Sequence, residues 1–361
     1  MWPYWVLFLL PAYWAVTRLK PTPNMAQPAL RNHFPPVWRG IFILLVLMIG
    51  FRHEVGGDWT SYIEHVHRMA DASIATALAE KDPAYGFFNW LAAMSGTGVY
   101  LVNLLCAVFA SWGILVFCRA QPRPWLALVV AVPYLITVVV MGYSRQGVSI
   151  GVSMLGMVAL GQGRVLRFVL WIVLAAVFHK SALILIPLAV LADSRRRLFT
   201  LLWVAVTGIV LFVLLLQESI DSLVSGYIES EYQSSGAAIR VAMNAVPAAL
   251  FLIFRKRFQL SPNERAFWTS MAWTALLFLV LLKVSPSSTA VDRVALYWIP
   301  LQLFVLSRLP NALGQRDDKN AVWVYTVVAY CAAIHFIWLL YAESAAAWLP
   351  YQFYPWVWLW Q

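Results

Sequence analysis

Long apolar runs alternate with short polar breaks along almost the whole chain. The runs are continuously apolar and lack the every-second-residue alternation of a β-strand, so they predict helices. A helix needs about 20 apolar residues to cross a bilayer, and several runs are shorter than that. From this pattern we predict about twelve membrane-spanning helices. They lie near residues 2–17, 38–51, 99–118, 125–141, 146–162, 166–178, 181–192, 198–216, 241–254, 266–284, 294–309 and 320–341.

Composition agrees with this pattern, because 62% of the residues are hydrophobic, 12% are charged and the mean hydropathy is +0.72. The predicted fold class is all-α, a single polytopic transmembrane domain over residues 1–361 with interfacial helices at its outer face. Two longer polar segments, 52–98 and 217–240, are predicted to be outer-face loops. Within the first, residues 86–98 are predicted to lie in the interface or to dip into the membrane without crossing it.

The charges divide unequally between alternate loops. One set of alternate loops holds 18 of the 26 basic residues, at 18–39, 119–123, 164–167, 193–197, 255–265 and 308–319. The loops on the opposite side hold 12 of the 16 acidic residues. The positive-inside rule places these basic loops in the cytoplasm. The N-terminus and the aromatic tail 351–360 are then predicted at the outer face. The net charge of +10 is explained by loops beside anionic lipid, so no nucleic-acid partner is needed.

Several kinds of chemistry have no support in the sequence. Cys106, Cys118 and Cys331 lie inside apolar runs without CxxC spacing or nearby histidines, which indicates neither a disulfide framework nor a metal site. The chain has no Gly-rich phosphate loop with a lysine, so no ATP-driven engine is visible. We predict no metal and no cofactor.

The candidates for function are ionisable residues at the ends of apolar runs, because charge near a membrane is expensive unless it is paired or used. Four such places fall on the predicted outer face. In the first, Gly56-Gly57 permits a sharp turn before Asp58. The four places are 51–62, 142–146, 178–181 and 292–297.

The first two places also have structural interpretations. Asp58 is equally well explained as the cap of a following helix, with Tyr62 one turn along the same face. Arg52 opposes the topology signal and needs an anionic partner, for which Glu54 and Asp58 are the candidates. Arg145 lies at or just below the outer surface, where its guanidinium suits a phosphate or carboxylate, or snorkels to lipid.

The other two places add a histidine and a third arginine to the same face. A lone histidine is more often structural, but His179, followed by Lys180, falls on the same membrane face as the arginines, which favours a functional role. Arg293 and Tyr297 lie one turn apart at the mouth of a helix, and in the simplest case Asp292 pairs with Arg293. A basic outer cavity beside lipid would suit a lipid-linked diphosphate.

In these motifs the chain resembles the EpsG family of Wzy-like polysaccharide polymerases, which are integral membrane glycosyltransferases. The resemblance covers roughly residues 40–310 and rests on the order of the motifs and their placement at outer helix ends. The stretch around Tyr85 departs from the family pattern, in which an acid shortly precedes a similar Gly-Tyr or Tyr-Gly pair, and Asp82 is the nearest acid. The motifs are Phe51-Arg52, Val55-Gly56-Gly57-Asp58, Tyr62, Ala84-Tyr85-Gly86-Phe87, Ser144-Arg145-Gln146, Phe178-His179-Lys180-Ser181-Ala182-Leu183, and Arg293 with Tyr297.

The resemblance implies a GT-C-like glycosyltransferase of the bacterial inner membrane whose site faces the periplasm. Donor and acceptor would be glycans on undecaprenyl diphosphate, and the product a longer exopolysaccharide, capsule or O-antigen-type chain. It also implies a chain-length regulator and a flippase as partners, besides the membrane lipids.

The chemistry of such a transfer assigns roles to the candidates. Arginines stabilise the negative charge of a leaving lipid diphosphate, a role we predict for Arg145 and Arg293 with Arg52 assisting. The sugar hydroxyl needs a base, and His179 is preferred to Asp58 because its ordinary pKa is near neutrality. Direct displacement would invert the anomeric centre, retention would need a covalent or ion-pair intermediate, and the sequence is compatible with both. The predicted substrate-binding residues are Arg52, Glu54, Tyr62, Gln146, Lys180 and Tyr297.

Two other classes of protein would use similar residues. A flippase or carrier of lipid-linked sugars would also have a basic cavity, but it would carry polar residues through the midplane and at both faces. A membrane O-acyltransferase would also use a histidine, yet no acyl-donor signature is visible on the cytoplasmic side. The segment 217–240 fits a glycan-holding loop and a solvated interfacial helix equally well. Because the candidates cluster on one face, the sequence favours the polymerase.

Overall fold

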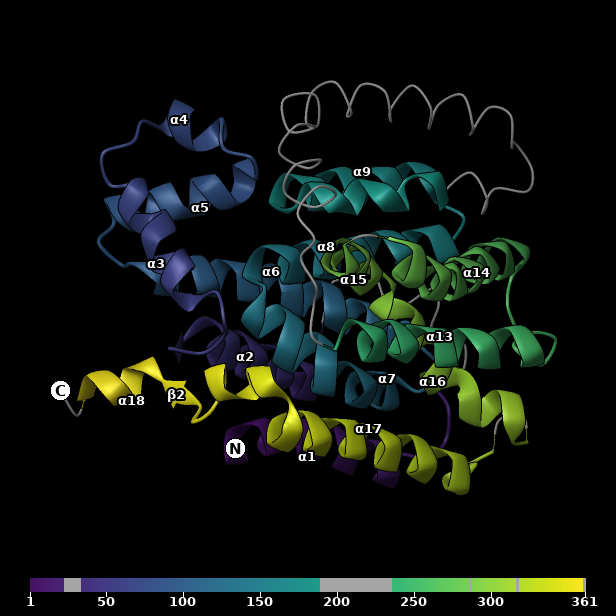
Figure 1. The fold of residues 1–361 in the computed structure, drawn as a ribbon. Helices are drawn as coiled ribbons and strands as arrows, with labels where there is room; N and C mark the ends of the chain where they lie inside the picture. Colours follow the sequence, from purple (N-terminus) through teal and green to yellow (C-terminus); the bar gives the residue numbers. More distant parts are fainter. Residues whose placement is uncertain (23–33, 189–235, 286, 316–317, 360–361) are drawn as a thin grey trace.

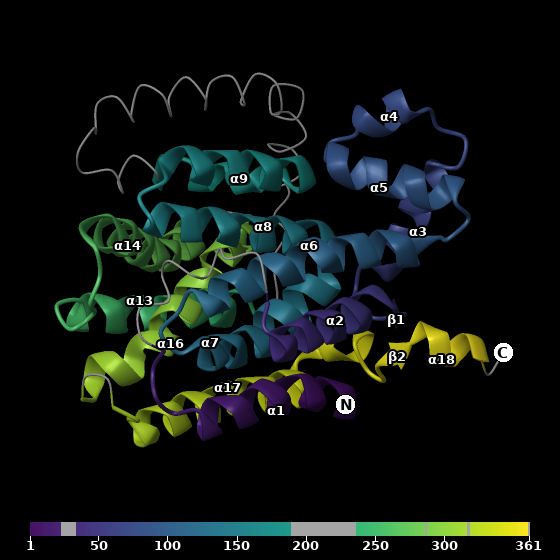
Figure 2. The ribbon, with the colours of Figure 1, turned by 180° about the vertical axis from the view of Figure 1, so that it is seen from behind.

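The computed structural model describes residues 1–22, 34–188, 236–285, 287–315 and 318–359. Almost all regular structure in these residues is helical (Figure 1). Most of the long helices run in roughly the same line, so their ends gather at two opposite sides of the molecule, as the view from behind also shows (Figure 2). This is the arrangement expected when many apolar helices cross one slab of lipid.

The N-terminal half supplies the helices at the centre of this bundle. Its first part is α1 (Trp2–Thr17), α2 (Pro36–Gly50), β1 (Arg52–His53), α3 (Trp59–Arg68), α4 (Ile74–Leu78) and α5 (Pro83–Met94). Its second part is α6 (Val99–Arg119), α7 (Pro124–Ala131), a π-helix (Val132–Val140), α8 (Ser144–Gly161), α9 (Val165–Phe178) and a 3-10 helix (Lys180–Leu185). The π-helix contains Pro133, whose nitrogen cannot donate a helical hydrogen bond.

The C-terminal half packs along these helices. It contains α13 (Ala237–Phe254), α14 (Pro262–Val284), α15 (Ser288–Ala295), a 3-10 turn (Leu296–Trp298), α16 (Ile299–Leu313), α17 (Ala321–Tyr341), a 3-10 helix (Glu343–Ala347), β2 (Gln352–Phe353) and α18 (Tyr354–Leu359). α14 begins with a capping box, in which Ser261 and Glu264 satisfy each other's backbone N–H groups.

The structure confirms the all-α membrane fold but not the predicted number of spans or the GT-C arrangement. Among the described residues, five helices are long and apolar enough to cross a membrane: Val99–Arg119, Ala237–Phe254, Pro262–Val284, Ser288–Leu313 and Ala321–Tyr341. Three shorter apolar helices are Pro36–Gly50, Pro124–Val140 and Val165–Phe178. The predicted span 198–216 and most of the predicted loop 217–240 lie outside the described residues. The predicted span 181–192 starts as a 3-10 helix and not as an α-helix.

The core lies where α8 packs between α6 and α9. Gly113 of α6 and Gly151 of α8 meet there, and a Cβ on Gly113 would collide with the carbonyl group of Gly151. A Cβ on Gly151 would lie 2.7 Å from the Cα of Ala110. Small residues let helix backbones approach this closely without a polar driving force. The contact fixes the position of α8, whose first residues belong to the site described below.

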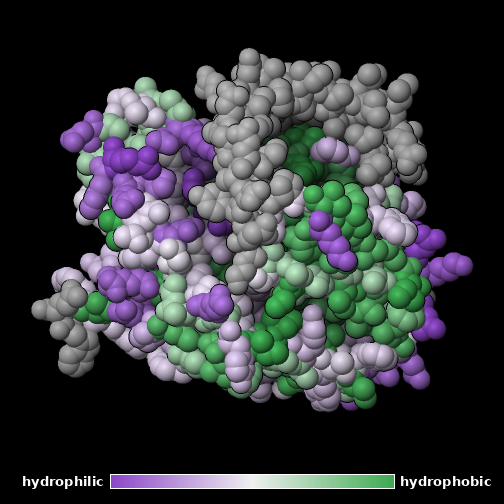
Figure 3. All heavy atoms as spheres, in the orientation of Figure 1, coloured by the Kyte–Doolittle hydropathy of each residue, from purple (hydrophilic) through white to green (hydrophobic). Residues whose placement is uncertain are grey.

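The surface divides into an apolar middle and two hydrophilic ends. Apolar side chains cover much of the face over α13 and α14, and strongly hydrophilic ones gather toward the ends (Figure 3). Exposed apolar residues of α13 and α14 include Ile253, Trp273 and Val280. Such a band is the expected contact surface for lipid tails.

One end of the molecule carries α3, α4 and α5 together with both ends of the described chain (Figure 1). Tyr4 donates a 2.8 Å hydrogen bond to the carbonyl of Trp348. β1 and β2 form an antiparallel pair, with Arg52 opposite Phe353. The structure therefore places the N-terminus and the aromatic C-terminal segment beside segment 52–98, as the charge pattern predicts.

Candidate functional site

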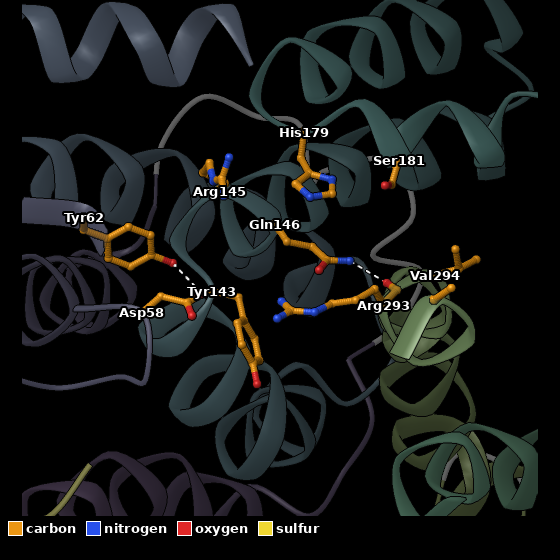
Figure 4. Close-up of a pocket in the computed structure, with 10 residues that line it drawn as sticks. Asp58, Tyr62, Tyr143, Arg145, Gln146, His179, Ser181, Arg293 and Val294 are labelled. Atoms are coloured by element: carbon orange, nitrogen blue, oxygen red, sulfur yellow. Dashed lines mark hydrogen bonds between the residues drawn. The ribbon is translucent and has the colours of Figure 1, made fainter. Parts of the chain in front are cut away.

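A cavity of about 320 Å³ opens at this end of the molecule (Figure 4). The side chains of Arg145, His179 and Arg293 surround the same space in Figure 4, although they come from α8, the end of α9 and α15. All four residues predicted to be catalytic line it, as do Tyr62 and Gln146. The lining residues are Asp58, Tyr62, Tyr143, Arg145, Gln146, His179, Ser181, Ala290, Arg293 and Val294.

Tyr62 fixes the turn that leads into α8. Its hydroxyl donates to the carbonyl of Gly142 at 3.1 Å and accepts from the N–H of Ser144 at 3.0 Å. Burial and the nearby Asp58 carboxylate raise the pKa of Tyr62 to about 12, so the hydroxyl stays protonated at neutral pH. The predicted binding residue Tyr62 thus shapes the backbone that carries the other site residues.

Asp58 stands at the N-cap position of α3, but its side chain makes no capping hydrogen bond. Its Oδ2 lies 3.5 Å from the Tyr62 hydroxyl, and the residue lines the cavity. The alternative prediction that the Asp58 side chain caps the helix is therefore wrong. The carboxylate remains accessible to a ligand in the cavity.

Arg145 forms an ion pair with an acid that precedes α5. Its Nη1 lies 3.1 Å from Oδ2 of Asp82, whose side chain is only 6% exposed. Burial raises the pKa of Asp82, while Arg145, Lys81 and a hydrogen bond from the Lys180 backbone oppose the rise. The guanidinium carbon of Arg145 also lies 5.6 Å from the ring centre of Tyr85. Sequence reasoning gave Asp82 no role, although the acid before the Tyr-Gly pair was the signal that would have found it.

Arg293 has different surroundings. Its guanidinium carbon lies 4.1 Å from the ring centre of Tyr143, and no carboxylate of the described part of the chain is within ion-pair distance of it. The predicted pairing of Asp292 with Arg293 is wrong, because Asp292 accepts two hydrogen bonds of 2.8 Å each from Arg240 of α13. Among the described residues, Arg293 is thus a cavity cation without a carboxylate partner.

His179 follows the last residue of α9, where the chain passes into the 3-10 helix. Its Nδ1 lies 3.3 Å from the hydroxyl of Tyr297. Burial in the first place, and then the positive charges of Arg145, Arg293 and Lys81, lower the pKa of His179 to about 3. The imidazole is therefore neutral at physiological pH and can accept a proton.

Gln146 links α8 to α15. Its Nε2 donates to the carbonyl of Arg293 at 2.5 Å. Its Oε1 is buried and has no hydrogen-bond partner within the described ranges. A buried acceptor of this kind is costly unless a ligand or water satisfies it. Gln146 thus lines the cavity with its Oε1 still an unsatisfied acceptor.

Two predicted binding residues lie near the loop 52–58 but do not line the cavity. Arg52 is fully buried and donates to the carbonyls of Ile49 and Val55 and to the side chains of Asn103 and Ser144. The predicted pairing of Arg52 with Glu54 or Asp58 is wrong, because its partners are neutral oxygens. The Glu54 side chain is 62% exposed and lies 3.9 Å from His53.

The other two predicted binding residues lie behind the cavity wall. Tyr297 is fully buried and contacts His179 and Ser149 with its hydroxyl. Lys180 contributes its backbone to the Asp82 carboxylate, and its side chain is not part of the cavity lining. The structure thus brings six of the ten predicted residues together in one cavity and places four outside it.

The fold and the site define a multi-pass helical membrane protein with a cationic, histidine-containing cavity at one end of its helices. The model of the EpsG family matches residues 37–353, nearly the whole chain, so the protein belongs to the EpsG family. This is a family of polysaccharide polymerases, which makes the protein a glycosyltransferase-type enzyme of exopolysaccharide synthesis. Neither the comparison with curated proteins nor that with solved structures found a match.

Proposed function

We propose that the protein joins glycan repeat units carried on undecaprenyl diphosphate, at the periplasmic face of the bacterial inner membrane. A hydroxyl of the acceptor glycan attacks the anomeric carbon of the donor glycan. The bond from that carbon to the diphosphate oxygen breaks, the lipid diphosphate leaves with the electron pair, and a base takes the hydroxyl proton. The observation that carries the proposal is that Arg145, His179 and Arg293 line one cavity at the end of apolar helices.

Arg293 is the main cation for the leaving group in this proposal. A guanidinium fork matches the geometry of phosphate oxygens, and charge that develops in the transition state is stabilised most by a donor already in place. Arg145 contributes less net charge, because Asp82 compensates it at 3.1 Å. Its role is to orient the donor, with its guanidinium held in place between Asp82 and the ring of Tyr85.

His179 is the base, and Asp58 is the second candidate for that role. With a pKa of about 3, His179 binds a proton only weakly, so it is a poor general base at neutral pH. The diphosphate of a bound donor brings negative charge next to the imidazole, and a nearby anion raises the pKa of a histidine. Donor binding therefore makes His179 a better base at the stage when the acceptor reacts.

The remaining cavity residues hold the sugars. The unpartnered Oε1 of Gln146 accepts a hydrogen bond from a glycan hydroxyl. Asp58 accepts another at the opposite side of the cavity in Figure 4. Arg52 and Tyr62 act indirectly, since both bind Ser144 and so fix the start of α8.

The test is polymerisation by the purified protein in liposomes supplied with a lipid-diphosphate-linked repeat unit. The proposal predicts a ladder of longer chains with the wild type and none with Arg293→Ala. Arg68→Ala is the matched control, because it removes the same charge from an exposed position of α3 outside the cavity. Transport of the lipid across the bilayer without a ladder would replace the polymerase by a carrier. A full ladder with folded Arg293→Ala would reject the assigned site.

A further inference from the structure

We infer that Ser149 and Tyr297 are positioning residues that hold His179 in the tautomer protonated on Nδ1, which leaves the Nε2 lone pair for the cavity. The tautomer is argued from hydrogen-bond geometry alone, while its catalytic meaning rests on the proposed function. The three residues come from α8, the turn before α16 and the end of α9, so only the folded chain brings them together.

Ser149 fixes the direction of the first hydrogen bond. Its Oγ lies 2.9 Å from the carbonyl oxygen of Ala175 and 3.4 Å from that of His179. Carbonyl oxygens only accept hydrogen bonds, so the single hydroxyl proton of Ser149 points at them. The Ala175 carbonyl also accepts the His179 N–H at 3.0 Å, and its second lone pair is free for the serine.

The direction of the next bond follows from this one. The Tyr297 hydroxyl lies 3.0 Å from Ser149 Oγ, whose proton is already used. Ser149 therefore accepts, and Tyr297 donates its only proton to it. The Tyr297 oxygen is left with lone pairs on the side of His179 Nδ1, 3.3 Å away. Only an Nδ1 that carries a proton makes a favourable contact there.

The opposite orientation leaves groups unsatisfied. If Tyr297 donated to Nδ1, Ser149 could donate to Tyr297, and its lone pairs would then face two carbonyl oxygens. If Ser149 kept donating to Ala175 instead, no proton would lie between the two hydroxyl oxygens, which are 3.0 Å apart. Ser149 and Tyr297 are both fully buried, so bulk solvent does not compensate them. Buried polar groups left without partners destabilise the folded state. The hydrogen-bond network therefore has one preferred direction.

The tautomer decides which ring nitrogen of His179 can accept a proton. A neutral imidazole has one donor and one acceptor nitrogen, and the partner of the donor decides which is which. With Nδ1–H directed at Tyr297, Nε2 is the acceptor for the proton of the attacking hydroxyl. When Nε2 takes that proton, the Nδ1–H bond to the tyrosine oxygen persists and stabilises the imidazolium.

The first test reads the tautomer of the wild type directly and does not depend on polymerase activity. Nitrogen-15 NMR of protein labelled in histidine distinguishes protonated from unprotonated ring nitrogens, and comparison with His179→Gln assigns the signals of His179. We expect a protonated Nδ1 and an unprotonated Nε2 in the wild type at neutral pH. A protonated Nε2 with a bare Nδ1 would overturn the inference, even if the protein polymerises glycans. A wild type without polymerase activity would instead overturn the proposed function and leave the tautomer result intact.

The second test distinguishes a positioning role of Tyr297 from a purely structural one. Tyr297→Phe removes the acceptor of Nδ1–H, and we expect kcat to fall about 10- to 100-fold, within the general-base contribution, while KM for the donor stays nearly unchanged. Tyr351→Phe is the matched control, since it removes a partly buried tyrosine hydroxyl, bonded to the Met48 carbonyl at 2.7 Å. Equal losses of kcat in both folded variants, or a loss confined to KM, would reject the positioning role.

Discussion

At the scale of single residues, the two arginines of the cavity differ in what surrounds them. Arg145 is compensated by the buried carboxylate of Asp82, whereas Arg293 lies on the ring of Tyr143. An arginine that faces an anion without a competing carboxylate stabilises that anion more, because no second negative charge offsets its field. We therefore assign stabilisation of the leaving group mainly to Arg293 and expect its mutation to lower the rate more than mutation of Arg145.

We expect Arg293→Ala to lower kcat by about 10²- to 10³-fold, the usual effect of removing one group that stabilises developing charge. Arg293→Lys should recover only part of this loss, because an ammonium group cannot form the paired hydrogen bonds of a guanidinium fork. The measurement is the initial rate of lipid diphosphate release. Arg68→Ala serves as the control for charge alone. Equal rates for Arg293→Lys and the wild type would show that the fork is not used.

The pH dependence of the rate tests the histidine. His179 must be neutral to accept a proton, so activity is lost as the pH falls through its pKa. That pKa is about 3 in the free protein, and the bound diphosphate raises it. Because kcat/KM reports the free enzyme and kcat the complex, we expect the acid limb of kcat at a higher pH than that of kcat/KM. Coincident limbs would contradict donor-assisted activation of His179.

At the scale of elements, the positions of the site residues depend on the start of α8. Tyr62 of α3 and the buried Arg52 both bind Ser144. The turn at Gly56 packs against the residues just before α8. Gly56 has a φ of +107°, and a Cβ there would lie 3.0 Å from the carbonyl oxygen of Met141. The adjacent Gly57 has open space around its Cβ position. Of the two glycines of the motif, only Gly56 is thus constrained by its backbone conformation and its neighbours.

We expect Gly56→Ala to lower the free energy of unfolding by about 1–3 kcal/mol, the usual cost of a strained backbone conformation, and to lower activity with it. Gly57→Ala should change both by little, since a methyl group fits there without contact. Unfolding in mixed micelles and the rate of polymerisation measure the two effects. Similar results for the two variants would show that the close approach to Met141 is not needed.

The helices of this fold could be predicted from sequence because each apolar run is a local signal. The predicted segments 2–17, 99–118 and 320–341 correspond to α1, α6 and α17 within one or two residues at each end. Local patterns also placed Asp58, Arg145, His179 and Arg293 on one face, because helix ends alternate between the two membrane surfaces. The short 3-10 helix after His179 has no comparable signature.

The partners of the charged residues could not be predicted in the same way. Arg145 pairs with Asp82 and Asp292 with Arg240, and both pairs join elements that are far apart in the sequence. Arg52 drew attention as a charge on the acidic face, yet its partners are carbonyl, amide and hydroxyl oxygens. Such choices depend on how the helices pack, which the spacing of residues along the chain does not contain.

At the scale of the whole molecule, the face shown in Figure 3 carries an apolar region between hydrophilic ends. The basic segment Arg255-Lys256-Arg257 lies beyond one end of α13, and the cavity lies at the other end of the bundle. By the positive-inside rule the basic end is expected in the cytoplasm, and the cavity would then face the periplasm, as the proposed function requires.

Cysteine labelling tests this orientation. Cys106, Cys118 and Cys331 are buried, so they give little background. We expect a membrane-impermeant maleimide to label Ser61→Cys in intact spheroplasts and to label Gln259→Cys only after permeabilisation, because both positions are exposed but lie at opposite ends. The reverse pattern would place the cavity in the cytoplasm and would remove the basis for a periplasmic reaction.

The central claim is that this cavity forms a glycosidic bond and expels a lipid diphosphate. The most direct measurement is a reaction in detergent solution, where no two compartments exist and transport produces no change, with donor, acceptor and products followed by mass spectrometry. The account predicts one lipid diphosphate released for each glycosidic bond formed, and neither product with folded His179→Gln or Arg293→Ala above a small residual rate. Intact lipid-linked repeat units after incubation with folded wild-type protein would contradict it.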